Sequence, residues 1–152
     1  METAQIVKML LTSPDFDAGE EIPEKYTCDG DNVSPALELD NIPPETKSLA
    51  ILMDDPDAPS GTWTHWLVWD IMPAKEIEES YQGGTMGIND FRTISYQGPC
   101  PPIGTHRYFI RVYALDVILD LAAGSTRDDL LKAMEYHIIG TGELMGLYSQ
   151  AD

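Results

Sequence analysis

The chain is divided into short apolar or alternating runs, each bounded by proline, glycine, aspartate or asparagine. Such runs occupy residues 5–11, 36–39, 48–53, 66–71, 108–115 and 143–148. Runs of this length with turn residues between them are typical of β-strands, and their number favours an antiparallel sandwich or barrel. We therefore predict a mostly β protein, with an antiparallel β-sandwich as its architecture.

One short helix is indicated near the C-terminus. Ser125 and Asp128 have the spacing of a capping box, and apolar residues at i, i+4 spacing follow within residues 130–138. Gly140 then ends the pattern. By contrast, the long polar stretch at residues 74–97 is expected to be an excursion over the surface.

Length and charge limit the classes of protein to consider. At 152 residues, 43% of them hydrophobic, the chain can close one sizeable core but is short for two ordinary domains, so we expect residues 1–152 to form a single domain. The formal net charge is −17. This charge disfavours binding to nucleic acid and to anionic membranes, although a few donors in a cleft can still hold a small anion.

The N-terminal segment and the two cysteines bear on location. Residues 1–12 have an acidic second residue and no basic segment, unlike a signal peptide, and no run approaches the roughly 20 apolar residues of a membrane span. We therefore expect a cytoplasmic protein. Cys28 and Cys100 lack CxxC or zinc-like spacing, so two reduced thiols are expected, with a disulfide between their loops as the alternative.

Two proline-stiffened loops each lead to a histidine. In the first loop, Asp55 and Asp57 follow the run at 48–53, Pro59 fixes the backbone, and His65 precedes the next run. A rigid loop on a β scaffold can hold carboxylates and a histidine ready for a ligand. Asp57 could equally do no more than turn the loop.

Strand alternation predicts the surroundings of the first histidine. In a regular strand, Trp63, His65 and Leu67 share one face, whereas Trp66 and Val68 take the other. His65 would then lie in a partly apolar, aromatic-walled niche. The tryptophans themselves are expected to pack in the core rather than to stack on a ligand.

The second loop repeats this pattern. Gly98 allows close approach of the backbone to a ligand, Pro101 stiffens the loop, and His106 and Tyr108 are two residues apart, so they point the same way in a strand. A histidine, a tyrosine hydroxyl and loop N–H groups suit a phosphate or a carboxylate. His137, on the expected helix, is left outside this site.

The two loops resemble the sequence blocks of the phosphatidylethanolamine-binding protein family, also called the Raf kinase inhibitor protein family. Asp55-Pro-Asp-Ala-Pro59 leads to His65, and Gly98-Pro-Cys-Pro-Pro102 leads to His106-Arg107-Tyr108. Tyr26-Thr-Cys-Asp-Gly30 is similar to a segment of the bacterial and archaeal branch. The resemblance implies a β-sandwich of a large antiparallel sheet and a smaller sheet, with one pocket for phosphoryl groups and similar anions that both blocks line.

Matched residue by residue, the family blocks fall on ten positions, which include Pro102 and Arg107, and we expect eight of the ten to bind the ligand. The eight are Asp55, Asp57, Pro59, His65, Gly98, Pro101, His106 and Tyr108. We expect no catalytic residue, metal ligand or cofactor, because no Gly-x-Ser-x-Gly motif is present and the acidic loop is stiffened by proline. The loop before His106 is shorter than in the animal members, whose long C-terminal helix has no counterpart after Tyr148. We therefore expect a pocket mouth that is wider or differently covered, and lipid selectivity does not carry over.

Three functions compete for these residues. The first, which is favoured, is non-catalytic binding of a small phosphorylated or carboxylated ligand, whose occupancy would regulate a protein partner. The second is inhibition of a serine protease or a kinase, as described for family members. The third is an enzyme in which two histidines and a carboxylate form a metal triad or a base beside a phosphoryl site.

A homodimer is also expected. The shorter C-terminus leaves a sheet edge or an apolar face that a longer chain would cover, and bacterial and archaeal relatives commonly pair.

Overall fold

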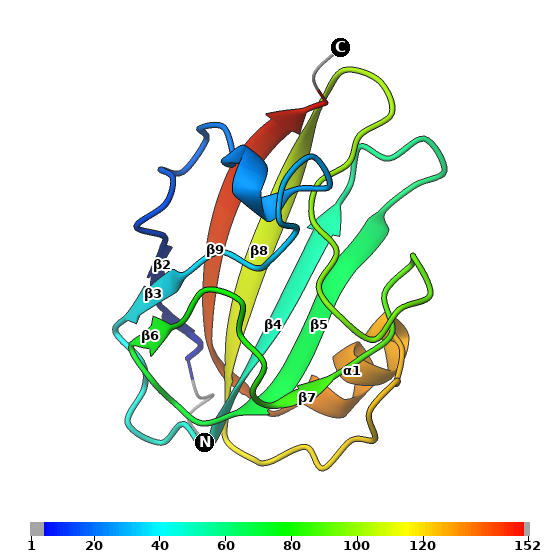
Figure 1. Ribbon diagram of the computed structural model, residues 1–152. Coiled ribbons are helices and arrows are strands. Elements are labelled where there is room, and N and C mark those ends of the chain that lie inside the picture. Colours follow the sequence, from blue (N-terminus) through cyan, green and yellow to red (C-terminus); the bar gives the residue numbers. More distant parts are fainter. Residues whose placement is uncertain (1–4, 151–152) are drawn as a thin grey trace.

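Two sheets of unequal size form the fold of the computed structural model, which describes residues 5–150 (Figure 1). The large sheet has six strands in the order β1-β9-β8-β4-β5-β7, and the small sheet has three in the order β2-β3-β6. The elements are β1 (Val7–Lys8), β2 (Leu10–Thr12), the 3-10 helix η1 (Glu24–Tyr26), β3 (Leu37–Asp40), β4 (Ser48–Asp55), β5 (Trp63–Ile71), β6 (Glu76–Ile77), β7 (Thr85–Met86), β8 (Thr105–Leu115), α1 (Arg127–Met134) and β9 (Ile138–Ser149). The outermost residues of the range 1–152 expected to form one domain lie outside the described residues.

The predicted mostly β architecture with one helix near the C-terminus is confirmed. The first apolar run, however, is divided between the two sheets. β1 pairs in parallel with β9, whereas β2 pairs with β3 in the small sheet. The chain crosses over at Met9, which is buried and whose N–H donates to the carbonyl oxygen of Thr141 at 2.8 Å.

Each face of the large sheet has its own apolar core. Tyr108, Ile110 and Val112 alternate along β8 and are buried on the face toward the small sheet. On the opposite face, α1 lies against the sheet (Figure 1). Trp69 of β5 packs there with Leu130 of α1, together with Ala50 and Leu52 of β4. Burial of each large side chain contributes about 1.5–3 kcal/mol. Among residues 5–150, no helix is both long and apolar enough to cross a membrane.

The polar stretch at residues 74–97 is more ordered than the expected surface excursion. It supplies β6 and β7, and Asn89 within it is buried. The N–H of Asp90 donates to the carbonyl oxygen of Thr64 at 3.0 Å, and the N–H of Gln97 donates to that of His65 at 3.1 Å. This stretch therefore provides hydrogen-bond donors to backbone carbonyl groups along the outer edge of β5. Its polar composition alone does not predict this pairing.

The helix cap lies one residue later than predicted. Thr126 is the N-cap, and its hydroxyl accepts a hydrogen bond from the N–H of Asp129 at 3.2 Å. The Asp129 carboxylate accepts in return from the N–H of Thr126 at 3.0 Å. Ser125 instead donates its hydroxyl to the carbonyl oxygen of Ala122. The capping-box pattern was thus read correctly in kind but placed one position too early.

Replacing the cap tests this assignment. Thr126→Ala should lower the free energy of unfolding by about 1 kcal/mol, because the N–H of Asp129 loses its acceptor. The matched control Ser125→Ala should change it by less than about 0.5 kcal/mol. Urea denaturation followed by circular dichroism measures both, and an equal or larger loss for Ser125→Ala would contradict the cap described here.

Candidate ligand-binding site

A cavity of about 270 Å³ lies where β4 ends and where β5 and β8 begin. Its walls come from these strand ends, from the loop after β4, from Phe91 and from the proline-rich loop before β8. The lining residues are Asp55, Ala58, Pro59, Ser60, Trp63, His65, Phe91, Cys100, Pro101, Pro102, His106 and Tyr108. Six of the eight predicted ligand-binding residues are therefore together, and Asp57 and Gly98 are not among them.

A β-bulge directs His65 toward this cavity. Met53 pairs with Trp66, but the next residue of β4, Asp54, pairs with Thr64, so His65 is an extra residue in β5. An extra residue reverses the alternation beyond it. The predicted shared face of Trp63, His65 and Leu67 is therefore wrong: the first two line the cavity, whereas Leu67 packs in the cluster beneath α1.

Two adjacent carboxylates at the end of β4 have different partners. Asp54 is buried and accepts from Arg111 Nη1 at 3.2 Å and from Arg127 Nη2 at 3.1 Å, which links β8 and α1 to this strand end. Asp55 lies in the cavity, where its Oδ2 is 2.6 Å from His106 Nδ1. Because successive strand residues point to opposite faces, Asp54 pairs with the arginines of β8 and α1, whereas Asp55 points into the cavity.

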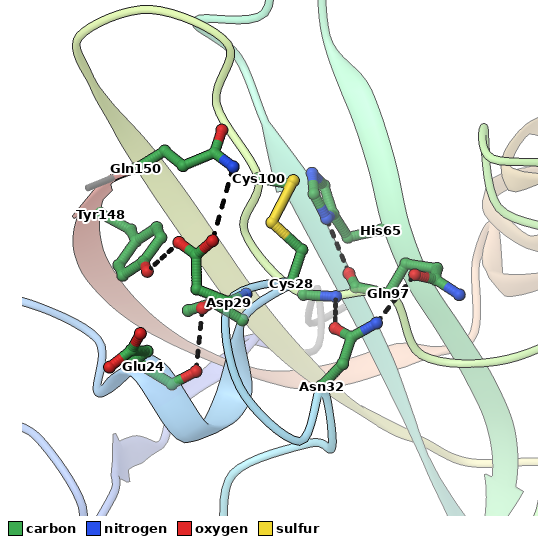
Figure 2. Close-up of a disulfide and its surroundings, with 11 residues drawn as sticks. Glu24, Cys28, Asp29, Asn32, His65, Gln97, Cys100, Tyr148 and Gln150 are labelled. Carbon is green, nitrogen blue, oxygen red and sulfur yellow. Dashed lines mark hydrogen bonds between the residues drawn. A yellow bond between two sulfur atoms is a disulfide. The ribbon is translucent and has the colours of Figure 1, made fainter. Parts of the chain in front are cut away.

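His65 is held by the backbone of the second loop. Its Nδ1 lies 2.7 Å from the carbonyl oxygen of Gln97, and since a carbonyl only accepts, Nδ1 is the donor (Figure 2). Burial lowers the pKa of His65 below its usual value, against the smaller raising effect of the Gln97 carbonyl. The neutral ring therefore presents Nε2 to the cavity as an acceptor.

The hydroxyl of Tyr108 is the unusual polar group of the site. Tyr108 is 1% exposed, and its hydroxyl makes no well-formed hydrogen bond among the described residues, although the Asp55 carboxylate and the Cys100 backbone lie close enough to affect its pKa. Its ring meets that of His65 edge to face, with 5.3 Å between centroids, and stacks near His106 at 6.4 Å. Burial raises the pKa of Tyr108, so the hydroxyl stays protonated and can donate to a ligand.

Asp57 supports the first loop from outside the cavity. Its carboxylate accepts from the N–H of Arg107 at 3.0 Å, from Nε at 2.9 Å and from Nη2 at 2.8 Å. These bonds from Arg107 lower the pKa of Asp57 to about 2. The N–H of Asp57 in turn donates to Asp55 Oδ1 at 2.8 Å. Asp57 was expected either to bind the ligand or to turn the loop, and its position outside the cavity fits the second role.

Gly98 packs behind the cavity wall rather than within it. Its N–H donates to Asn32 Oδ1 at 2.8 Å. A Cβ at this position would lie 2.0 Å from the carbonyl oxygen of Tyr26, so a side chain would force the two loops apart. The close approach expected of this glycine is therefore made to a neighbouring loop of the chain.

One aromatic wall residue, Phe91, was not predicted from the sequence, whereas Trp63 was expected on the same face as His65. Trp66 and Trp69 are buried in the cores as expected, but Trp63 lines the cavity. Phe91 lies edge to face against Trp63 at 5.7 Å and against His65 at 5.1 Å. The sequence signal for Phe91 is a single phenylalanine within a polar stretch. Asn89 organises the turn there, because its side-chain oxygen accepts a hydrogen bond from the N–H of Phe91.

The expectation of two reduced thiols is wrong, and the alternative holds. Cys28 and Cys100 form a disulfide, with 5.5 Å between their Cα atoms (Figure 2). Cys100 lines the cavity, whereas Cys28 belongs to the loop after η1. In the described part of the chain, no three histidine, cysteine or acidic side chains are grouped as metal ligands would be.

Comparisons with known proteins cover both loops. The family model described as phosphatidylethanolamine-binding protein matches residues 12–149. A UPF0098 protein of Methanothermobacter thermautotrophicus is 49% identical over 148 residues, which are 92% of this chain and 98% of that protein. A UPF0098 protein of Archaeoglobus fulgidus is 42% identical over 158 residues, which are 99% of this chain but 54% of that protein.

Solved structures agree with the sequence matches. A phosphatidylethanolamine-binding protein homolog from Chlamydia trachomatis has a TM-score of 0.91 at 41% identity, covering 98% of this chain and 100% of that one. YbcL of E. coli, described as a member of the mammalian family of these proteins, has a TM-score of 0.86 at 27% identity, covering 94% and 99%. Similar proteins thus occur in both archaea and bacteria.

The lowered pKa of His65 predicts a pH-dependent stability. Below a pH of about 6.5, His65 is protonated in the unfolded chain but stays neutral in the folded chain. As the pH is lowered, the free energy of unfolding therefore decreases by up to about 1.4 kcal/mol per pH unit, until the pKa of His65 in the folded chain is passed. Denaturant unfolding at pH 7.5, 6.5 and 5.5 should show this extra loss in the wild type and not in His65→Gln. Parallel curves for the two proteins would contradict the neutral, buried imidazole.

Proposed function

The chain belongs to the phosphatidylethanolamine-binding protein family, and we propose that its cavity binds a small phosphorylated or carboxylated ligand without catalysis. The observation that carries the proposal is the buried Tyr108 hydroxyl without a partner. Leaving such a group unsatisfied costs about 1–3 kcal/mol, and a ligand oxygen in the cavity would accept its hydrogen bond.

The polar groups of the cavity define the ligand's chemistry. Tyr108 offers a donor and neutral His65 offers the acceptor Nε2, whereas Asp55 adds a negative charge that is paired with His106. A phosphomonoester that carries one proton supplies both acceptor oxygens and one donor. The fully ionised dianion lacks that donor and is repelled by Asp55. The protonated monoanion is therefore the favoured form.

The walls favour a small ligand. Pro59, Trp63, Phe91 and Pro101 surround the polar groups with apolar surface, as is typical of small-molecule sites. At about 270 Å³ the cavity is smaller than the range of roughly 300–1,000 Å³ that drug-sized ligands occupy. The proposed ligand group is thus about the size of a phosphoryl or carboxyl group with a few attached atoms. A protein with a net charge of −17 would hold it through local contacts alone.

The proposal predicts tighter binding at acidic pH. Because the second pKa of a phosphomonoester is about 6, the affinity of O-phosphorylethanolamine should be about tenfold or more higher at pH 5.5 than at pH 8. Isothermal titration calorimetry across this range measures the dependence. An affinity that does not change between the two pH values would contradict the shared proton.

Two matched variants separate the causes. Asp55→Asn removes the carboxylate from the cavity and should flatten the pH dependence. Asp57→Asn makes the same chemical change in the same loop but outside the cavity, so it should keep the wild-type dependence whatever its affinity. A flattened curve for Asp57→Asn alone would place the responsible carboxylate outside the cavity.

A further inference from the structure

The two sulfurs of the Cys28–Cys100 disulfide lie in different surroundings (Figure 2). Cys28 is exposed, in the surface loop that follows η1. Cys100 is half-buried and forms part of the cavity wall, near His65 and Tyr108 in the lining. One covalent bond therefore connects the outer surface with the candidate site.

The loops that the disulfide joins also hold together without it. The N–H of Cys28 donates to the carbonyl oxygen of Pro99 at 3.1 Å, and Asn32 Nδ2 donates to Gln97 Oε1 at 3.0 Å. The Tyr96 hydroxyl donates to the carbonyl oxygen of Tyr26 at 2.7 Å. Opening the disulfide would thus free the Cys100 side chain while these bonds keep the loops in contact.

We propose that the disulfide is a thiol-exchange site that regulates the cavity, an inference that rests on the proposed anion binding. A thiolate from solvent attacks Cys28 Sγ and forms a mixed disulfide there. The Cys28–Cys100 bond breaks, its electron pair leaves on Cys100 Sγ, and the proton of the attacking thiol goes to solvent. Cys100 Sγ then takes up a proton from solvent, so the net change is one disulfide exchanged for another, with a new thiol in the cavity wall.

Exposure selects Cys28 as the residue that is attacked. Disulfides that solvent can reach are the ones that exchange readily, and Cys28 is the exposed end of this one. The exposed carboxylates Asp29 and Asp31 follow Cys28, so a positively charged aminothiol should react faster than an anionic thiol.

Exchange would weaken anion binding for two reasons. The freed Cys100 side chain is no longer held in the wall and can move into the space that faces the ligand, and the wall loses its covalent link to the loop after η1. By linkage, a ligand that prefers the closed disulfide must in turn oppose its opening.

Mapping the adduct tests the direction of attack. The oxidised full chain is treated with cysteamine, free thiols are alkylated with iodoacetamide, and peptides are analysed by mass spectrometry. We expect cysteamine on Cys28, the alkyl group on Cys100, and slower reaction with glutathione, which is anionic. Cysteamine on Cys100, or no adduct, would overturn the proposal.

Single-cysteine variants test whether Cys100 faces the ligand. In Cys28→Ser, inorganic phosphate at about ten times its Kd leaves about a tenth of the cavities open, so alkylation of Cys100 should slow about tenfold. In Cys100→Ser, the same phosphate should not slow alkylation of Cys28. Equal effects in the two variants, or none in either, would overturn the regulatory link.

The outcomes for the two proposals are separable. Phosphate binding is measured independently on the oxidised wild type. If that protein binds no phosphate, the proposed phosphoryl binding fails and its regulation by the disulfide fails with it, whereas the cysteamine map still decides whether exchange occurs at Cys28. If phosphate binds but protects neither variant, only the regulatory inference fails.

Discussion

A single extra residue in β5 is the constraint on which the candidate site depends. The bulge at His65 changes the pairing between Met53 and Asp54, and it turns His65 and Trp63 toward the cavity instead of toward α1. Without it, regular alternation would send the imidazole to the face that Leu67 and the helix occupy. Asp54 and Asp55, which pair with β5 at this bulge, also have separate roles. The Asp54 carboxylate is paired with arginines of the scaffold, whereas that of Asp55 is paired with His106.

Much of the fold could be predicted because its elements are marked by short patterns of neighbouring residues. Turn residues delimit the strands, and a capping box marks the helix, so the element types were right even where Thr126 rather than Ser125 is the cap. The two proline-rich loops likewise identified most of the cavity lining. Local patterns carry this information because each depends on a few neighbouring residues.

The remaining features depend on pairing between distant residues. Strand alternation cannot reveal a bulge, which exists only in the register of β5 against β4. The outward turn of Asp57 depends on Arg107, 50 residues away, and the disulfide closes a separation of 72 residues. Phe91 reaches the cavity because Asn89 folds a polar stretch into a turn. A single sequence contains these residues but does not show which of them meet.

The central claim is that two histidines and the unpaired Tyr108 hydroxyl form one anion site, and NMR titration with inorganic phosphate tests it most directly. Histidine ring and tryptophan indole signals are followed in the wild type and in His65→Ala. We predict saturable shifts for His65, His106 and the Trp63 indole in the wild type, with a single Kd, and their loss in the variant, while His137 is unchanged because it lies outside the cavity. No shift at millimolar phosphate, or shifts of equal size in the variant, would contradict the account.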